Sequence, residues 1–259
     1  MSPKNRSILT LVLVTLGIIA ANYLAFRSNT DTGDIANNTF NDTNYFFPAT
    51  YVFTTIWPVI YARLFGWAVY QALPANRDNR RFQAAAPWVV LNIFLNALWV
   101  LVFGMEAFVS TLPIMFALVI VTLIVYRKLE IGVTPVSLWE RLIQITISIY
   151  FAWLTVATVA NIASALISVG WNGFGLSAEV WALVMLLVGA GLALFLYRGL
   201  RHDVVILLTY LYAYAGILVR YSDVTLVLAG GVLGMLIIGA AAARHFIARR
   251  GQTATLKAA

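Results

Sequence analysis

Eight long apolar runs constrain the fold of this chain more than any other feature. They cover residues 8–26, 51–73, 84–103, 107–126, 142–169, 180–197, 204–219 and 224–243. About 18–20 apolar residues suffice to cross the hydrocarbon of a bilayer as a helix, and the seventh run is the shortest. Backbone groups in lipid must find hydrogen-bond partners within their own segment. We therefore predict an all-α integral membrane protein with eight spans.

The basic residues follow a topological pattern. The chain is 62% hydrophobic and 10% charged, with a net charge of +7 that could otherwise indicate a nucleic-acid partner. If the N-terminus is cytoplasmic, 14 of the 17 Lys and Arg lie in inner segments: Lys4, Arg6, Arg77, Arg80, Arg81, Arg127, Lys128, Arg141, Arg198, Arg201, Arg244, Arg249, Arg250 and Lys257. The positive-inside rule explains this distribution without nucleic acid. It predicts a multi-pass protein of the bacterial cytoplasmic membrane with both termini in the cytoplasm.

Two features outside the span pattern suggest further roles. The first outer loop, residues 27–47, is the longest connection, and long loops of this kind often serve as lids over a site. Gly230 and Gly234 form a GxxxG pair in the eighth run, where small residues permit close helix contact. This contact can be internal or can join another subunit. We therefore keep open a homodimer or a larger membrane complex formed through the C-terminal helices.

The stretch IYFAWLTVATVAN, residues 149–161, combines apolar character with costly polar groups. Tyr150, Trp153, Ala157 and Asn161 follow steps of three and four, which place them on one helix face. At 1.5 Å per residue, most polar and aromatic residues of three runs fall in the outer half of the membrane. They are Trp57, Asn96, Trp99 and Asn161, with Trp153 deeper. Plain packing explains any one of them, but together they also suit a pocket for a flat amphipathic ligand.

Three motifs resemble the signature stretches of the TspO/MBR family, which includes tryptophan-rich sensory proteins and the translocator protein, or peripheral benzodiazepine receptor. The first is ATYVFTTIWPVIY (49–61), which matches the family at Pro48, Tyr51, Phe53, Trp57 and Tyr61. The second is LNALWVLVFG (95–104), with Asn96 and Trp99, and the third is YFAWLTVATVAN (150–161), with Tyr150, Ala152, Trp153, Ala157, Thr158 and Asn161.

The resemblance implies a five-helix bundle, often dimeric, with a pocket under the first outer loop. In that family the pocket takes porphyrins or haem, and animal members take sterols or synthetic ligands. The residues that the resemblance assigns to ligand binding are Tyr51, Phe53, Trp57, Tyr61, Asn96, Trp99, Tyr150, Trp153, Ala157 and Asn161. Trp57 and Trp153 match the tryptophans implicated in porphyrin photo-oxidation, and they are the only candidates for a catalytic role.

The chain departs from the family pattern in several places. The double proline is Pro48-Ala49 here, and IASAL follows Asn161 in place of a sterol-associated segment, which argues against sterol binding. The motifs end in the fifth run. We therefore predict a ligand-binding bundle over residues 1–169 and, over residues 170–259, three additional helices with a basic cytoplasmic tail.

The ionisable residues limit the chemistry. The chain has no cysteine, and its two histidines, His202 and His245, lie at the inner edge beside arginines. No resident cofactor or metal is therefore predicted, and a bound porphyrin, haem or other tetrapyrrole would be held by stacking and hydrogen bonds. Arg63 is the one charged residue within a predicted span, and such charges are costly in lipid. It either snorkels to the inner surface or serves as a counter-charge for a ligand propionate, a lipid phosphate or a partner subunit.

Three functions are compatible with these observations. The first is a membrane sensor or receptor that binds a tetrapyrrole or similar flat apolar ligand in an aromatic pocket within the membrane. The second is a structural or accessory subunit of a larger membrane complex. The third is weak enzymatic degradation of porphyrin in light and oxygen.

Overall fold

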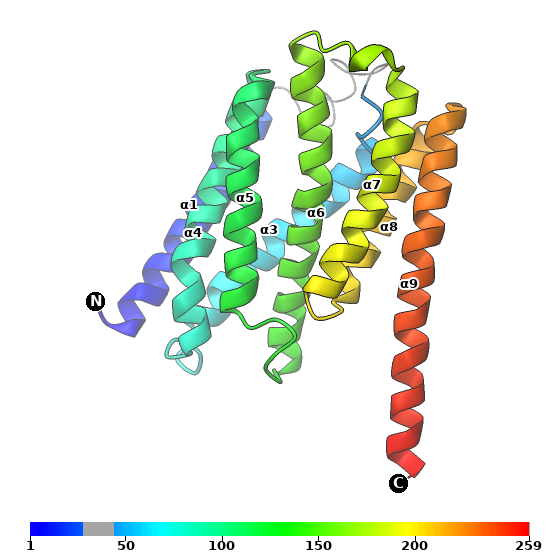
Figure 1. Ribbon diagram of the computed structural model, residues 1–259. Coiled ribbons are helices and arrows are strands. Elements are labelled where there is room, and N and C mark those ends of the chain that lie inside the picture. The colour runs from blue at the N-terminus through cyan, green and yellow to red at the C-terminus, as the bar shows by residue number, and fades with distance from the viewer. Residues whose placement is uncertain (28–43, 259) are drawn as a thin grey trace.

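The computed structural model describes residues 1–27 and 44–258, and every regular element in these ranges is helical. The long helices are α1 (Pro3–Arg27), α3 (Thr50–Ala72), α4 (Arg80–Gly104), α5 (Phe108–Lys128), α6 (Leu138–Ser168), α7 (Ala178–Gly199), α8 (Val204–Arg220) and α9 (Thr225–Ala258). A 3₁₀ turn, Gly173–Gly175, joins α6 to α7. Each apolar run matches one helix, with at most one of its residues outside that helix, so the prediction of an all-α membrane protein is confirmed (Figure 1).

Seven of the described helices are long and apolar enough to cross a membrane, and α8 with 17 residues is shorter. At 1.5 Å per residue α8 spans roughly 25 Å, close to the hydrocarbon thickness. It also joins the lower end of α7 to the upper start of α9, so the chain crosses the bundle along α8 (Figure 1). Both termini consequently lie toward the same end of the bundle, which is called the inner end below.

Polar caps mark where several spans begin. The side chains of Asn79, Ser137, Ser177 and Asp203 each accept a hydrogen bond from a backbone N–H in the first turn of the following helix. Such caps satisfy donors that have no partner within the helix. The start of each of these helices is therefore marked by a contact between residues that are close in the sequence.

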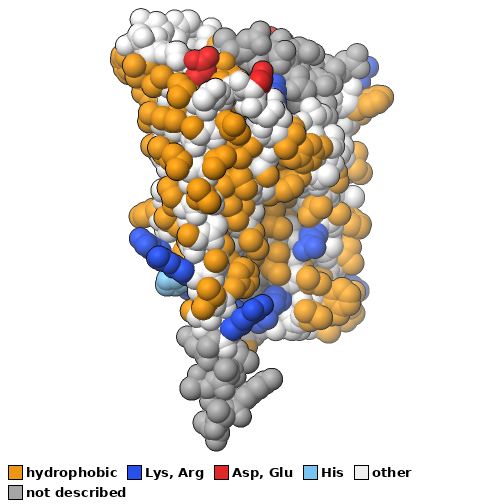
Figure 2. Space-filling view, turned by 90° about the vertical axis from the view of Figure 1, so that its right-hand side faces the viewer, with side chains coloured by type: hydrophobic (Ala, Val, Ile, Leu, Met, Phe, Trp, Pro, Cys, Tyr) orange, Lys and Arg blue, Asp and Glu red, His pale blue; other side chains and the backbone are white. Residues whose placement is uncertain are grey.

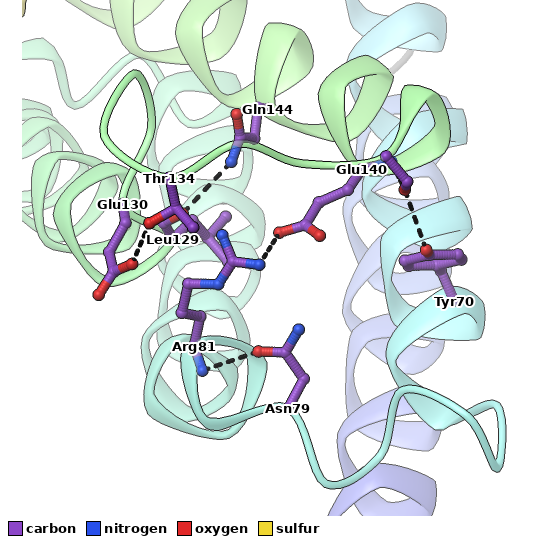
Figure 3. A network of polar contacts seen from close by, with 9 residues as sticks. Tyr70, Asn79, Arg81, Leu129, Glu130, Thr134, Glu140 and Gln144 are labelled. Atoms are coloured by element: carbon purple, nitrogen blue, oxygen red, sulfur yellow. Dashed lines mark hydrogen bonds and ion pairs between the residues drawn. The ribbon is translucent and has the colours of Figure 1, made fainter.

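A polar network joins the inner ends of α4 and α6 (Figure 3). The Arg81 guanidinium forms an ion pair with the Glu140 carboxylate at 2.7 Å. The Gln144 amide donates to the Leu129 carbonyl, which brings the connection after α5 against α6. Arg81 of α4 is therefore balanced by a carboxylate of α6.

Helix α6 occupies the centre of the bundle, between α5, α3 and α8. All side chains from Phe151 to Val156 are buried, including those on opposite faces of the helix. A helix that is covered all round needs no polar face. This position explains why α6 tolerates so many bulky residues in succession.

Helix α8 attaches the last three helices to the first five. The hydroxyls of Tyr210 and Thr155 lie 2.9 Å apart, and the Asp203 carboxylate accepts hydrogen bonds from Ser148 and Tyr126. A Cβ at Gly216 would overlap Val52 of α3, so glycine permits this close approach. The division at residue 169 stays a prediction, but the side chains of the two parts interlock through α8.

The GxxxG pair of α9 packs within the chain. A Cβ at Gly230 would overlap the Leu183 backbone of α7, and one at Gly234 would overlap the Tyr214 ring of α8. These glycines therefore allow α9 to lie close to α7 and α8. A dimer or larger complex through the C-terminal helices stays a prediction, and it would have to use other surfaces of α7–α9.

The topology leads to the first testable prediction. We expect a reporter fused after Val169 to lie outside the membrane and a reporter at the C-terminus to lie in the cytoplasm, because basic residues concentrate at the inner end. In Figure 2, Lys, Arg and His side chains gather low on the face shown and acidic side chains high. Paired phosphatase and fluorescent-protein fusions measure the two positions. Two cytoplasmic readings would show that α6 does not cross as predicted.

Candidate ligand-binding site

An aromatic cluster fills the space between α3, α4 and α6. The Trp57 ring stacks with Tyr61 at 5.5 Å and with Trp99 at 6.4 Å between ring centroids. Tyr150 presents its edge to Trp57 at 6.2 Å. The Trp57–Tyr61 pair follows from the i, i+4 spacing on one helix, whereas the other two contacts join separate helices. We call this group and the rings described next the aromatic cluster.

A second group of rings continues the aromatic cluster toward its outer side. Phe53 meets Trp153 edge to face at 5.6 Å, and Phe103 stacks on Trp99 at 4.9 Å. Phe47 lies above them and contacts both Phe53 and Phe103. Phe47 is buried, so it covers the aromatic cluster on its outer side.

Hydrogen bonds hold the cover in place. The Asn44 amide donates to the Ala160 carbonyl and to the Ser164 hydroxyl of α6, and the Tyr221 hydroxyl donates to the Asn44 carbonyl at 2.9 Å. The residues from Asn44 to Phe47 are thus tied to α6 and to the end of α8. Residues 28–43 of the predicted lid lie outside the described residues.

One side chain connects three helices beside the aromatic cluster. The Trp99 indole N–H donates to the Asn161 Oδ1 at 2.9 Å, and the Asn161 amide donates to the Thr111 hydroxyl at 2.6 Å. Asn161 is therefore satisfied as acceptor and donor at once, and it links α6 to α4 and α5. On the far side of the aromatic cluster, the Tyr61 hydroxyl donates to Asn96 Oδ1 at 2.6 Å.

Four buried polar atoms of the aromatic cluster have no hydrogen-bond partner. They are the indole nitrogens of Trp57 and Trp153, and the amide nitrogen of Asn96 and the hydroxyl of Tyr150, which face each other without a well-formed hydrogen bond. Nearly all buried polar groups in proteins are paired, and leaving one unpaired costs about 1–3 kcal/mol. All four can donate a proton in a hydrogen bond. The arrangement therefore favours a molecule that presents acceptors.

The cavity beside these rings is small. Its volume is about 20 Å³, and its walls include Phe47, Phe53, Trp57, Trp153 and Asn161. A cavity of this size holds about one water molecule, whereas drug-sized ligands occupy about 300–1,000 Å³. Phe46 lies in the wall of this cavity and also in the wall of an apolar groove of about 520 Å³ between α6 and α7. Phe46 therefore borders both spaces.

The structure brings most of the predicted ligand-binding residues together. Phe53, Trp57, Trp99, Trp153, Ala157 and Asn161 line the small cavity. Tyr61, Asn96 and Tyr150 adjoin it through Trp57 and through the Tyr61–Asn96 hydrogen bond. Tyr51 lies apart: it is 44% exposed on α3, because two residues before Phe53 is nearly the opposite side of a helix.

Arg63 also lies outside the aromatic cluster. Its guanidinium is on an exposed part of α3 and donates to the Leu142 carbonyl and to the Thr146 hydroxyl of α6. These bonds satisfy part of the charged group within the bundle. A contact with a ligand or lipid anion stays a prediction.

Sequence reasoning missed one partner of Asn161. Phe46 and Phe47 form the end of the predicted lid, residues 27–47, and two phenylalanines before Pro48 are a strongly apolar end for a solvated segment. Thr111 lies in α5, the helix before the one that carries the third motif. Nothing in the linear sequence relates it to Asn161. Its own hydroxyl also donates to the Phe108 carbonyl.

A family model described as "TSPO-like protein" matches residues 7–244. The chain belongs to the TSPO-like protein family. The match continues through α7, α8 and most of α9, whereas the three sequence motifs end within α6. Comparisons with curated proteins and with solved structures give no match. This TSPO-like chain is thus a multi-pass membrane protein of the TspO type, as its motifs predicted.

The bridge made by Asn161 leads to the second prediction. We expect Asn161→Leu to lower the free energy of unfolding by about 1–2 kcal/mol, because Trp99 and Thr111 both lose their partner across helices. Unfolding by SDS titration of the detergent-solubilised TSPO-like protein measures this change. Asn22→Leu is the matched control, since exposed Asn22 bonds only the Ile18 carbonyl of its own helix. Equal effects of the two variants would contradict the role of the bridge.

Proposed function

We propose that this chain is a membrane receptor of the TspO type that binds a tetrapyrrole, or a similar flat apolar ligand, in the aromatic cluster. The observation that carries the proposal is the set of four unpaired buried donors within that cluster. A core built only for packing would gain stability by replacing such groups with apolar ones. Retaining them is useful when a ligand supplies the missing acceptors.

The chemistry of the donors narrows the ligand class. Two indole N–H groups, an amide and a phenol all act as donors toward carboxylate or carbonyl oxygens. The neighbouring rings of Trp57, Trp99 and Trp153 offer flat faces for stacking. A planar ring system with carboxylate or carbonyl substituents matches both features, and carboxylated porphyrins belong to this class.

Binding requires more room than the small cavity has. The apolar groove between α6 and α7 lies on the other side of Phe46 and has about 520 Å³. We propose that Phe46 turns aside when a ligand enters, so that the ligand occupies part of the groove and reaches the cluster donors. Entry from the groove would let an apolar molecule arrive from the lipid rather than from water.

Tyr150 gives the third prediction. We expect Tyr150→Phe to weaken protoporphyrin binding about three- to tenfold, because the ligand loses one hydrogen bond. The same change should cost little stability, since the Asn96 amide faces this hydroxyl without a well-formed hydrogen bond. Quenching of tryptophan fluorescence on titration measures affinity, and SDS titration measures stability.

Tyr210→Phe is the matched control for Tyr150→Phe. Tyr210 is equally buried, but its hydroxyl is paired with Thr155 at 2.9 Å. We expect this variant to lose stability and to keep its affinity for protoporphyrin. If Tyr150→Phe loses stability and keeps affinity in the same way, its hydroxyl serves packing and the receptor proposal loses its main support.

The stacking rings give the fourth prediction. We expect Trp153→Leu and Trp57→Leu each to weaken protoporphyrin binding about three- to tenfold, because stacking on an indole contributes about 0.5–1.5 kcal/mol beyond area burial. Fluorescence titration again measures affinity. Trp139→Leu is the control, because Trp139 is 70% exposed and far along α6 from the cluster. Unchanged affinity in both cluster variants would leave the accessory-subunit function as the better explanation.

A further inference from the structure

The inner ends of α7 and α9 enclose a second, basic cavity that is separate from the aromatic cluster. It has a volume of about 720 Å³, and its polar wall consists of Tyr197, four arginines and two histidines: Arg198, Arg201, His202, Arg244, His245 and Arg249. Basic side chains and a histidine gather low on the face of the molecule that includes α9 (Figure 2).

Two arginines of this cavity lie away from the nearest carboxylate. No Asp or Glu is among the residues that line the cavity. Asp203 lies in the adjoining cavity, where it brings one negative charge near Arg201, His202 and His245. Arg198 and Arg244 line only the basic cavity, which therefore keeps an excess of positive charge. The contrast with the inner end of α4 is direct, because Arg81 there has the Glu140 carboxylate at 2.7 Å. The basic cavity therefore favours an anion from outside the chain.

The backbone also adopts an uncommon conformation at this point. Arg201 and His202 both have φ of 58°, in the left-handed region that residues other than glycine seldom adopt. Strain of this kind tends to occur where side chains are held for a ligand. The turn places both side chains in the cavity wall, while the Tyr197 hydroxyl bonds the His245 ring at 2.9 Å and orients it.

The remaining wall is apolar and lies deeper in the membrane. Leu194 is one helical turn before Arg198, and Ala240 and Ile237 are one and two turns before Arg244. The cavity is thus basic at the inner surface and apolar toward the hydrocarbon. We infer that it binds a net-negative phospholipid, with the phosphate among the arginines and the start of an acyl chain against Leu194, Ile237 and Ala240.

Lipid titration of the full chain in mild detergent, followed by native mass spectrometry, tests the inference. We expect phosphatidylglycerol to bind about tenfold more tightly than phosphatidylcholine. The double variant Arg198→Gln/Arg244→Gln should reduce phosphatidylglycerol affinity by about tenfold or more, since each basic residue near an anionic headgroup adds appreciably to binding. Both arginines are exposed, so these changes remove charge without disturbing the core.

Two further variants separate this site from general attraction. Arg80→Gln/Arg127→Gln removes the same charge from exposed inner residues outside the cavity and should leave phosphatidylglycerol affinity unchanged. Ala240→Phe fills the apolar part and should weaken binding without a change in charge. Equal loss in the two double variants, or full affinity in Ala240→Phe, would overturn the assignment. Displacement of the lipid by an equal concentration of inorganic phosphate would also overturn it, in favour of a soluble phosphate ligand.

Discussion

Helices in a bilayer gain little from apolar contact alone, because lipid tails are as apolar as their side chains. Close packing and a few interhelical hydrogen bonds must therefore define this bundle, and α6 provides many of them. Asn161 reaches α4 and α5, Thr155 and Ser148 reach α8, and Ser164 receives the segment that covers the aromatic cluster. The position of every ring in the cluster depends on this central helix.

The same helix carries groups that are satisfied and groups that are not. Asn161 uses both ends of its amide, whereas Tyr150 and Trp153, on the same side of the helix, have unpaired polar atoms. The satisfied residue contributes to assembly, and the unpaired residues leave hydrogen-bonding capacity for a ligand. On this interpretation, different turns of α6 contribute to stability and to ligand binding. We therefore expect substitutions at Asn161 to change mainly stability and substitutions at Tyr150 or Trp153 to change mainly affinity.

Two places at the inner end differ in how they balance charge. Between α4 and α6 an arginine meets a carboxylate within the chain, whereas between α7 and α9 Arg198 and Arg244 line a cavity whose wall contains no carboxylate. The membrane itself is the nearest source of negative charge for the second set.

The sequence by itself determined the helical membrane fold, the approximate limits of the helices apart from the end of α9, which continues to Ala258, and the family through the motifs around Trp57, Trp99 and Trp153. These properties follow from local composition and spacing, since a long apolar run in lipid has few structures open to it. The helical period also indicated that Trp153 and Asn161 share a side of α6. Only the tertiary structure decided that Tyr51 lies outside the cluster, that Phe47 covers it, that Gly230 and Gly234 pack within the chain, and that Asn161 is paired while Tyr150 is not. Each of these depends on which residue of another helix stands opposite, and that is set by packing between segments far apart in the chain rather than by any local pattern.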